Sequence, residues 1–295
     1  MSWSEKLKAK ILFDEPLSRH TTLRIGPRAR IWAEPSDDKD LRKLLIKAKK
    51  ERLRYLVLGC GSKLLIKKKN IPLAIRLNSA HFKKCVAQGS DLIAGAGLGV
   101  RGLVGEAYKN GLGGLEFLSG LPASVGGAVM LNAGISWPKR IEIGAFVYSL
   151  RVMDENGKLK TFNKKELEFN YRSSNLGPYI ILSARFRLFK KRKSNIKVKM
   201  QKFLEYRRQT QELGYPSAGC IFKNPDGQSA GRLIDLCGLK GRTAAGAQIS
   251  RRHANFIINR GNASAEDILS LMKLAKMEVK KRFGINLEPE IQVIS

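Results

Sequence analysis

The sequence predicts an α+β protein with two domains. Its 295 residues correspond to about two domains of roughly 150 residues each. Because 43% of the residues are hydrophobic, the chain can bury sizeable cores, which excludes a disordered or fibrous protein. In the first two thirds, strand-like and helix-like patterns follow one another around glycine-rich loops, and this mixture favours the α+β class.

The N-terminal part predicts two helices and several short strands. Ser36-Asp37-Asp38 is typical of a helix N-cap with acids in the first turn, and apolar residues continue at helical spacing to Ala48. A second helix, whose apolar face begins at Val100, stops at Gly111. Short strands are expected at Leu53 to Leu58, Pro72 to Leu77 and Asp91 to Ala94.

A hairpin, a strand and two further helices are expected in the rest of the chain. Asn156-Gly157, flanked by alternating apolar residues, indicates the hairpin. The strand Tyr179 to Phe189 is followed by the basic run Lys190 to Asn195, which we expect to be the domain boundary. The helices are predicted at Val198 to Arg208 and from the capping box at Ser264 to Asp267 as far as Gly284.

The charge balance leaves three kinds of partner open. With 55 Lys and Arg against 25 Asp and Glu, the formal net charge is +30. A field of this sign attracts nucleic acid, acidic membranes, or substrates and cofactors that carry diphosphates. Composition does not choose among them, and a lysine-rich bias that leaves solvated basic surface is the simplest account.

Other sequence features favour a cytoplasmic protein without a membrane anchor or a metal site. The first six residues, Met1 to Lys6, lack the pattern of a secretory signal. The uncharged run Phe117 to Pro138 contains too many helix breakers for a membrane span. The four cysteines form no C-x-x-C pair and His occurs only three times, so no metal-ligand cluster is predicted and the thiols are expected to be reduced.

Two glycine loops are candidate anion cradles. They are Gly59-Cys60-Gly61-Ser62 and the segment Gly120 to Gly127. Glycine lets backbone N–H groups approach a diphosphate closely and adopts the positive φ angles of a concave nest. The first loop lacks G-x-G-x-x-G spacing, so a Rossmann nicotinamide site is not supported. Taken singly, each loop could be an ordinary tight turn.

Three further segments contain side chains that could carry out chemistry. Ser217 to Pro225 includes Cys220, whose thiol can donate a proton or attack as a thiolate, although a small buried hydrophobe is the plainer interpretation. Tyr171 to Ser174 and Leu287 to Ile291 each place a charge beside apolar residues. A guanidinium can stabilise an enolate, and a carboxyl in an apolar pocket can become a hydrogen-bond donor, but surface charges would leave the same pattern.

Six segments follow one another in a characteristic order along the chain, and they are Thr21 to Gly26, Leu58 to Ser62, Gly114 to Pro122, Tyr171-Arg172, Ser217 to Pro225 and Leu287 to Glu290. Together they resemble the corresponding motifs of the UDP-N-acetylenolpyruvoylglucosamine reductases. The resemblance implies an enzyme of peptidoglycan precursor synthesis, and therefore of cell-wall biogenesis, cell shape and cell division. It extends from about Thr21 to the C-terminus.

The resemblance implies a fold and a reaction. An FAD-binding domain of the vanillyl-alcohol-oxidase type is expected over residues 1–192, with subdomains of about 1–80 and 81–192. A substrate-binding α+β domain is expected over 193–295, with its C-terminal strand returning to the active site. NADPH would reduce FAD, and flavin N5 would then pass hydride to C3 of UDP-N-acetylglucosamine enolpyruvate to give UDP-N-acetylmuramate. A protein acid would protonate C2.

The resemblance also implies roles for particular residues. Cys220 matches the proton donor, which is usually serine, and Arg172 and Glu290 match residues thought to stabilise the intermediate. Substrate contacts are expected from Tyr171, Lys223, Asn224 and His253. Flavin contacts are expected from Gly59, Cys60, Gly61, Ser62, Ser119, Gly126, Gly127 and Arg207. A monomer is expected, with no membrane and no specific nucleic-acid partner.

The chain departs from the family pattern at three positions and in one interval. Cys60 and Lys63 stand where the first loop usually has glycine and asparagine, and Ala123 replaces a glycine. The interval from Arg172 to Cys220 is short, which resembles the class that lacks a tyrosine-bearing lid insertion. Two alternatives stay open, which are another FAD oxidoreductase on the same scaffold and a basic nucleic-acid-binding protein.

Overall fold

The computed structural model describes residues 7–136 and 138–295. Met1 to Lys6, predicted to carry no secretory signal, and Trp137 in the uncharged run lie outside the described residues. The chain forms two compact units. The first comprises the described residues up to Glu15, Ala29–Cys60 and Ile71–Glu205, and the second comprises Pro16–Arg28, Gly61–Asn70 and Tyr206–Ser295. The boundaries predicted near residue 80 and at residue 192 stay predictions.

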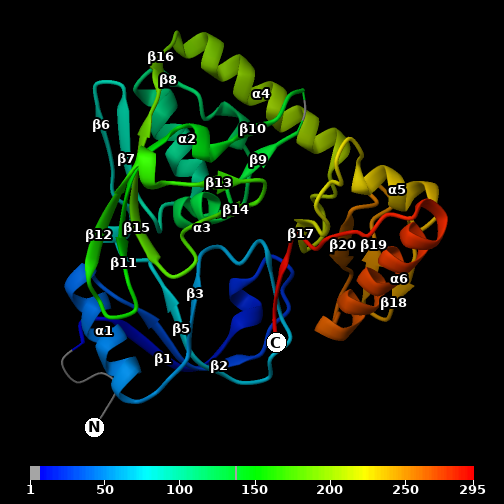
Figure 1. The fold of residues 1–295 in the computed structure, drawn as a ribbon, viewed down its shortest axis with the longest axis horizontal. Coiled ribbons are helices and arrows are strands. Elements are labelled where there is room, and N and C mark those ends of the chain that lie inside the picture. Colours follow the sequence, from blue (N-terminus) through cyan, green and yellow to red (C-terminus); the bar gives the residue numbers. More distant parts are fainter. Residues whose placement is uncertain (1–6, 137) are drawn as a thin grey trace. The chain divides into compact units, whose positions relative to one another are not determined.

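The first unit contains a four-stranded sheet with helix α1 (Asp38–Lys50) against it (Figure 1). The strand order is β1 (Lys10–Pro16), β2 (Arg28–Glu34), β5 (Ile71–Arg76), β3 (Tyr55–Leu58). Strands β2, β5 and β3 run parallel. Helix α1 begins where predicted because the Asp37 side chain accepts a hydrogen bond from the Asp40 N–H at 2.8 Å. Its apolar face joins β2 and β5 in one core.

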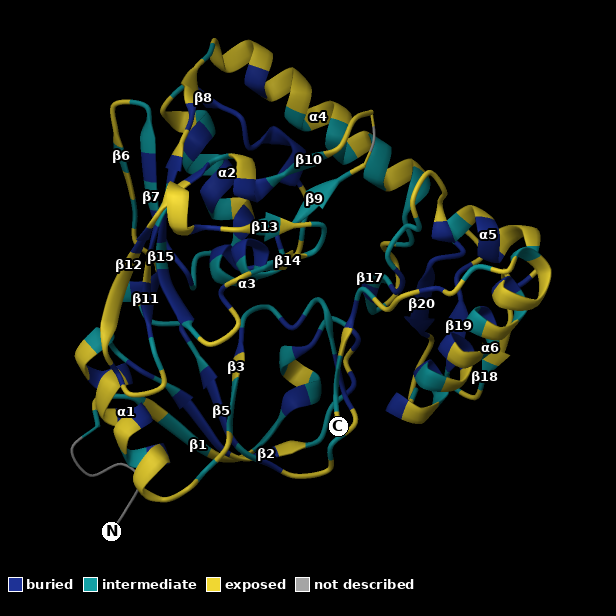
Figure 2. Ribbon diagram, in the orientation of Figure 1, coloured by how far each residue is buried: buried dark blue, intermediate teal, exposed yellow. Residues whose placement is uncertain are grey.

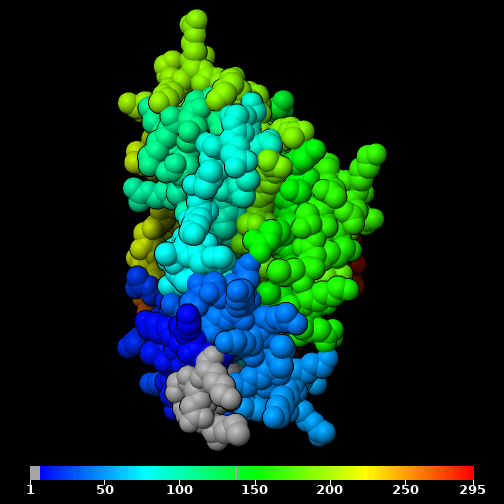
Figure 3. Space-filling view, turned by 90° about the vertical axis from the view of Figure 1, so that its left-hand side faces the viewer, coloured from blue at the N-terminus to red at the C-terminus, as the bar shows by residue number. Residues whose placement is uncertain are grey.

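The second sheet of this unit is antiparallel. Its order is β12 (Leu159–Asn163), β11 (Val147–Met153), β15 (Ile180–Arg187), β7 (Asp91–Gly95), β6 (Cys85–Gln88). Figure 2 shows the central strands β15 and β7 largely buried and the edge strand β12 exposed. Strands β11 and β12 form the predicted hairpin, in whose loop Gly157 has a φ of +76°. On the face seen in Figure 3, the cyan residues of β6 and β7 lie above the blue residues of α1.

Helices α2 (Val100–Lys109) and α3 (Val125–Met130) lie beside the antiparallel sheet (Figure 1). Short strand pairs are β8 (Leu112–Gly113) with β16 (Phe189–Lys190), β9 (Gly134–Ile135) with β10 (Ile141–Glu142), and β13 (Phe169–Asn170) with β14 (Ser173–Ser174). Single 3₁₀ turns are η1 (Leu17–His20), η2 (His81–Lys83), η3 (Glu116–Leu118), η4 (Ile143–Ala145) and η5 (Lys164–Glu166). Within the described ranges, no helix is long and apolar enough to cross a membrane.

The second unit has its own sheet, two helices and a separate parallel pair of strands. The sheet order is β17 (Ser217–Cys220), β20 (Phe256–Asn259), β19 (Ala247–Ile249), β18 (Thr243–Ala244). Helices α5 (Ala230–Leu236) and α6 (Ala265–Phe283) bury their apolar faces in the core of this unit. Strands β4 (Leu64–Ile66) and β21 (Gln292–Ile294) pair in parallel. The predicted capping box at Ser264 and C-cap at Gly284 are confirmed.

Helix α4 (Lys193–Thr210) begins earlier than the predicted helix at Val198 to Arg208. It includes the end of the basic run Lys190 to Asn195, which the sequence predicts to be the domain boundary. Ile196 is the one residue of α4 that is fully buried. A helix that is polar nearly all round shows little apolar periodicity, which is why its first turn was not predicted.

Candidate active site

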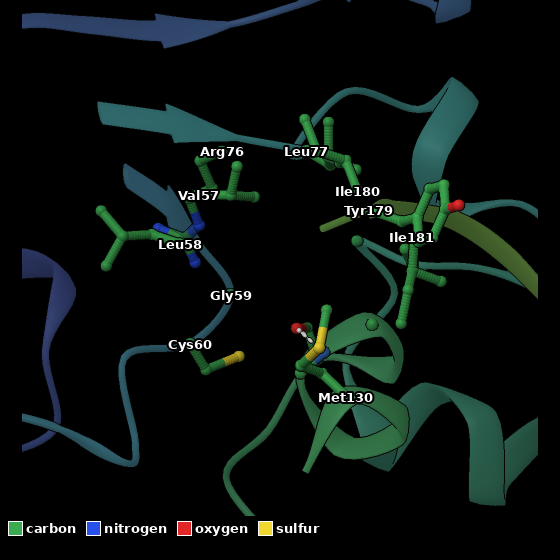
Figure 4. A pocket seen from close by; sticks show the side chains of 15 residues that line it. Val57, Leu58, Gly59, Cys60, Arg76, Leu77, Met130, Tyr179, Ile180 and Ile181 are labelled. Carbon is green, nitrogen blue, oxygen red and sulfur yellow. Dashed lines mark hydrogen bonds between the residues drawn. The ribbon is translucent and has the colours of Figure 1, made fainter. Parts of the chain in front are cut away.

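A cavity of about 140 Å³ lies in the first unit (Figure 4). It is bounded by the loop after β3, the end of β5, the start of α3 and the start of β15. All of its lining residues belong to the first unit. Figure 4 shows the sulfur of Cys60 pointing into this space toward Met130, with Tyr179 and Leu77 on other sides. The lining of the cavity therefore combines apolar side chains with several glycines.

The predicted glycine loop Gly59 to Ser62 contributes backbone to both units. Gly59 and Cys60 line the cavity in the first unit. Gly61 and Ser62 belong to the second unit, where the Gly61 carbonyl accepts a hydrogen bond from the Thr22 N–H at 3.2 Å. Gly61 has a φ of +61°, and a Cβ there would lie 2.8 Å from Thr21 Cα. Only glycine fits this position without strain.

The second glycine loop leaves room for a ligand, but the N–H groups of Gly126 and Gly127 already have hydrogen-bond acceptors within the protein. The Gly126 N–H donates to the Ala96 carbonyl at 2.9 Å, and the Gly127 N–H donates to Ser124 Oγ at 3.2 Å. A Cβ on Gly126 would come within 3.0 Å of Ala96 Cβ. Since both amides already have partners, these two glycines let a ligand approach closely and also fix the first turn of α3.

Two side chains of the first unit fit a bound group, and one of them, Cys60, lines this cavity. Ser119 is 4% exposed, and its Oγ has no hydrogen-bond partner among the residues that the structure describes. Buried hydroxyls ordinarily have partners, so this one suits a ligand acceptor. Burial raises the pKa of the Cys60 thiol, and the charges of Arg76 and Lys83 only partly oppose this rise. The thiol is therefore neutral at pH 7.

Tyr171 and Arg172 form the turn between β13 and β14 in the first unit. Arg172 has a φ of +59°, which is uncommon for a residue with a side chain. Its Nη2 donates to the Gly134 carbonyl at 3.0 Å. The guanidinium carbon lies 5.1 Å from the centre of the Tyr171 ring, and that of Arg140 lies 4.4 Å from it. A strained residue that is held in this way is typical of functional sites.

Cys220 stands at the end of β17 on a β-bulge in the second unit. Ser217 pairs with Ile258 and Cys220 pairs with Phe256, so β17 has one extra residue between the two pairs. Gly219 has a φ of +68° and provides the bend. Bulges re-aim side chains near active sites. Cys220 is half-buried and forms no disulfide, and its charge when ionised opposes the lowering of the Arg207 pKa by burial.

Glu290 lies two residues before the start of β21 and is joined to Cys220 through Lys63. The Glu290 side chain is 6% exposed, and its Oε1 lies 2.7 Å from Lys63 Nζ. The same Nζ donates to the Cys220 carbonyl oxygen at 2.7 Å. The second unit thus brings two of the three predicted catalytic residues together, while Arg172 belongs to the first unit. Lys63 was noted in the sequence only as a departure from the family pattern.

The predicted substrate residues of the second unit surround the same segment. Lys223 Nζ lies 3.3 Å from Glu288 Oε2. Asn224 Oδ1 accepts a hydrogen bond from the Ala230 N–H at 3.1 Å, which fixes the start of α5. His253 Nδ1 accepts from the Asn255 N–H at 3.2 Å. Burial lowers the pKa of His253, so its imidazole is neutral at pH 7 with the proton on Nε2.

Asn255 was missed by the sequence analysis. Its side chain is 2% exposed and holds the backbone of Phe222, because Oδ1 accepts from the Phe222 N–H at 2.9 Å and Nδ2 donates to the Phe222 carbonyl at 2.8 Å. It therefore shapes the segment that carries Cys220 and Lys223. Its proximity to His253 in the sequence was the only available signal.

Comparisons with known proteins agree along the whole chain. A family model described as UDP-N-acetylenolpyruvoylglucosamine reductase, C-terminal domain, matches residues 211–294, and one described as FAD binding domain matches residues 29–163. The UDP-N-acetylenolpyruvoylglucosamine reductase of Pelobacter propionicus is 39% identical over 290 residues, which cover 98% of this chain and 97% of that protein. The protein of the same name from Agathobacter rectalis is 40% identical over 298 residues, with 96% and 94% covered.

A solved structure agrees as well. The crystal structure of UDP-N-acetylenolpyruvylglucosamine reductase from Thermus caldophilus has a TM-score of 0.82 and 34% identity to this chain, and the match covers 98% of this chain and 100% of that one. The chain belongs to the UDP-N-acetylenolpyruvoylglucosamine reductase family.

Membership in the UDP-N-acetylenolpyruvoylglucosamine reductase family confirms the resemblance read from the sequence. The chain is an FAD-dependent oxidoreductase, and the expected α+β fold with an FAD-binding domain of the vanillyl-alcohol-oxidase type is confirmed. The residues of the first unit fit such a cofactor, because several glycines and a neutral thiol line the cavity, and the Ser119 hydroxyl is buried without a partner in the described ranges. Within those ranges, no group of three or more His, Cys, Asp and Glu could hold a metal ion.

Proposed function

We propose that the chain reduces UDP-N-acetylglucosamine enolpyruvate to UDP-N-acetylmuramate with NADPH, in peptidoglycan precursor synthesis. The names of its relatives at 39% and 40% identity support this substrate. The observation that carries the proposal is the linked group of Cys220, Lys63 and Glu290 in the second unit. We further propose that the protein acts as a cytoplasmic monomer, and that it binds no specific nucleic acid.

Bound FAD would supply the redox chemistry of this proposal, which is the transfer of hydride from NADPH to C3 of the enolpyruvyl group. The residues proposed to hold it are Gly59, Cys60, Ser119, Gly126 and Gly127 from the first unit and Gly61, Ser62 and Arg207 from the second. Ser119 would donate from its buried hydroxyl, and Arg207 would contribute a guanidinium. The glycines leave room for the ligand beside the backbone.

Cys220 is the proposed proton donor to C2. Hydride delivery to C3 leaves negative charge at C2, next to a carboxylate that is already charged. A thiol, with an ordinary pKa of about 8.5, gives up a proton far more readily than a hydroxyl. Arg172 would stabilise the growing negative charge with its guanidinium. Glu290, which is linked to Cys220 through Lys63, would also help to stabilise the intermediate.

Substrate binding would use four polar side chains. His253 is neutral and carries its proton on Nε2, so it can donate one hydrogen bond to an oxygen of the sugar nucleotide. Lys223 can meet an anionic group, and Tyr171 and Asn224 would supply further polar contacts. The pairing of Lys223 with the exposed Glu288 is a surface pair that a diphosphate can displace.

The two half-reactions test this function separately. Anaerobic mixing of the purified holoenzyme with NADPH should bleach the flavin band. Subsequent addition of the enolpyruvyl sugar nucleotide should restore the band and yield UDP-N-acetylmuramate. An enzyme whose flavin is reoxidised by oxygen but not by the sugar nucleotide would instead be a different oxidoreductase on the same scaffold.

A further inference from the structure

Lys63 holds a central place in the candidate site that the glycine-loop pattern does not explain. Its Nζ lies 2.7 Å from Glu290 Oε1 and 2.7 Å from the Cys220 carbonyl oxygen. The lysine side chain is 23% exposed and the glutamate side chain is 6% exposed. One ammonium therefore contacts both a nearly buried carboxylate and the backbone of the proposed proton donor.

The fold of the second unit imposes this contact. Strands β4 and β21 are parallel, with Leu64 opposite Gln292, so the residues before the two strands lie at the same end of the pair. The Gln292 N–H donates to the Lys63 carbonyl at 2.8 Å, which fixes the start of both strands. The Glu290 N–H donates to the Ile221 carbonyl at 2.7 Å, which ties the same end to the residue after Cys220.

The bulge at Gly219 brings the third member of the cluster within reach. A Cβ at Gly219 would lie 3.6 Å from Lys63 Nζ. The lysine therefore approaches the bend directly, and its hydrogen bond is to the carbonyl of the residue that follows. A bulge is locally less constrained than a regular ladder, because its extra residue is left unpaired. The ammonium adds a hydrogen bond at Cys220, the residue with which the regular pairing resumes after the bulge.

The charge of Lys63 also allows Glu290 to be buried as a carboxylate. A carboxylate that is nearly removed from water is costly unless it is paired and hydrogen-bonded. Lysine provides both a full positive charge and several N–H donors, so it can satisfy the carboxylate and the Cys220 carbonyl at the same time. A neutral amide at this position would supply hydrogen bonds without a neutralising charge.

We propose that Lys63 is a positioning residue for proton transfer, which fixes the geometry of Cys220 and Glu290 as one unit. The proposal rests on the proposed function, because the proton transfer is a step of that reaction. Lys63 touches neither reacting carbon in this scheme and acts through its two neighbours. The reduction of the flavin by NADPH does not need this geometry, so Lys63 should matter in only one half-reaction.

The test compares three substitutions of one residue in the holoenzyme. Lys63→Met should slow reoxidation of the flavin by saturating enolpyruvyl sugar nucleotide by about 10-fold or more, with little change in KM, as losses of positioning contacts do. Bleaching by NADPH should keep its rate. Lys63→Arg should reoxidise the flavin faster than Lys63→Met but more slowly than the wild type. Lys63→Asn should be slower than Lys63→Arg because an amide lacks the positive charge. Lys109→Met is the matched control, since it removes an exposed lysine that lies 2.7 Å from Glu106.

Two further readouts separate positioning from mere stabilisation. If Lys63 and Glu290 act together, Lys63→Met should slow reoxidation much less in a Glu290→Gln background than in the wild type. The urea midpoint of unfolding should likewise fall less in that background, and this measurement needs no activity. A wild-type reoxidation rate in Lys63→Met, or equal slowing of both half-reactions, overturns the proposal.

The outcomes also separate this inference from the proposed function. If Glu290→Gln reoxidises the flavin as fast as the wild type, the assigned role of Glu290 fails and the positioning role of Lys63 fails with it. If Glu290→Gln is slow while Lys63→Met is unaffected, the proposed function stands and only the role of Lys63 is wrong. A failure of the wild type to turn over the enolpyruvyl sugar nucleotide overturns the function itself.

Discussion

The candidate role of Cys220 depends on how its backbone is held as well as on the chemistry of its thiol. The bulge at Gly219 and the hydrogen bond from Lys63 to the Cys220 carbonyl define where the side chain starts. Cys60, by contrast, points into the cavity of the first unit, and burial raises its pKa. The chain thus places two thiols in very different settings, and only one has a carboxylate and a cation in its cluster.

The first prediction concerns the thiol of Cys220. Cys220→Ala should keep bleaching by NADPH but lose reoxidation by the enolpyruvyl sugar nucleotide by about 10²-fold or more, because general acid catalysis contributes on that scale. Cys220→Ser should retain measurable turnover, since a hydroxyl can still donate. Stopped-flow absorbance of the flavin measures both steps, and Cys237→Ala, which removes a thiol at the end of α5 outside the candidate site, provides the control. An alanine variant with wild-type reoxidation would remove Cys220 from the mechanism.

The second prediction concerns pH and His253. Its folded-state pKa is lowered by burial, whereas an unfolded histidine titrates near 6.5. As pH falls, the unfolded state binds the proton first, so this contribution to stability is present above about pH 6.5 and is lost as pH falls through the folded pKa. The free energy of unfolding should therefore fall more steeply as pH drops below about 6.5 in the wild type than in His253→Gln. Equal slopes in urea titrations would contradict the pKa assignment.

Among the elements, the short helix α3 has an N-cap residue that also lines the cavity of the first unit. Ser124 accepts the hydrogen bond that begins the helix and also lines the cavity. The capping box at Ser264 does the same for α6, which lines no part of that cavity. Both serines therefore cap the N-terminus of a helix, but only Ser124 lines the cavity of the first unit.

The third prediction uses this pair of serines. Ser124→Ala should weaken FAD binding by about 5-fold, because the loss of an N-cap is worth roughly 1 kcal/mol and leaves the Gly127 N–H without its acceptor. Ser264→Ala should lower the free energy of unfolding by about 1 kcal/mol and leave FAD binding unchanged. Fluorescence titration of the apoprotein with FAD measures the first effect. Equal FAD affinity in the two variants would separate α3 from cofactor binding.

Local signals predicted the elements better than the site. The helices α1 and α6 begin at the predicted caps because a cap acts within one turn. The start of α4 was missed because nearly all of its residues are at least partly exposed. The parallel pairing of β4 with β21, and therefore the contact of Lys63 with Glu290, joins segments far apart in the sequence. No spacing rule reports such a contact. Met130 and Tyr179 in the cavity carried no signal for the same reason.

At the scale of the whole molecule, the net charge of +30 is the least ordinary property. Several cations are paired, such as Lys191 with the buried Glu116 at 3.0 Å, but acids are too few to pair most of them. The excess must therefore lie largely in solvent, where like charges repel. The field can steer diphosphate-bearing ligands, but it also reduces the stability of the compact state.

The fourth prediction follows from this repulsion. Raising NaCl from about 10 mM to about 150 mM shortens the Debye length from roughly 30 Å to roughly 8 Å. The urea midpoint of unfolding should rise over this range, because screening relieves repulsion in the folded state more than in the expanded one. Any binding to random DNA should weaken steeply over the same range while both half-reactions persist. Tight DNA binding that survives at 150 mM salt would favour the nucleic-acid alternative.

The composition of the second unit has a consequence for biosynthesis. This unit combines Pro16–Arg28 and Gly61–Asn70 with the residues from Tyr206 to Ser295. Its strand β4 is synthesised long before β21, the strand with which it pairs. A ribosome that adds roughly 5–20 residues per second exposes the early stretches well before their final partner emerges. The apolar residues Leu23 and Leu65 therefore lack most of the core that covers them until the residues from Ala218 to Ile291 have been synthesised. The unit that carries Cys220 and Glu290 should consequently be the last part of the nascent chain to fold.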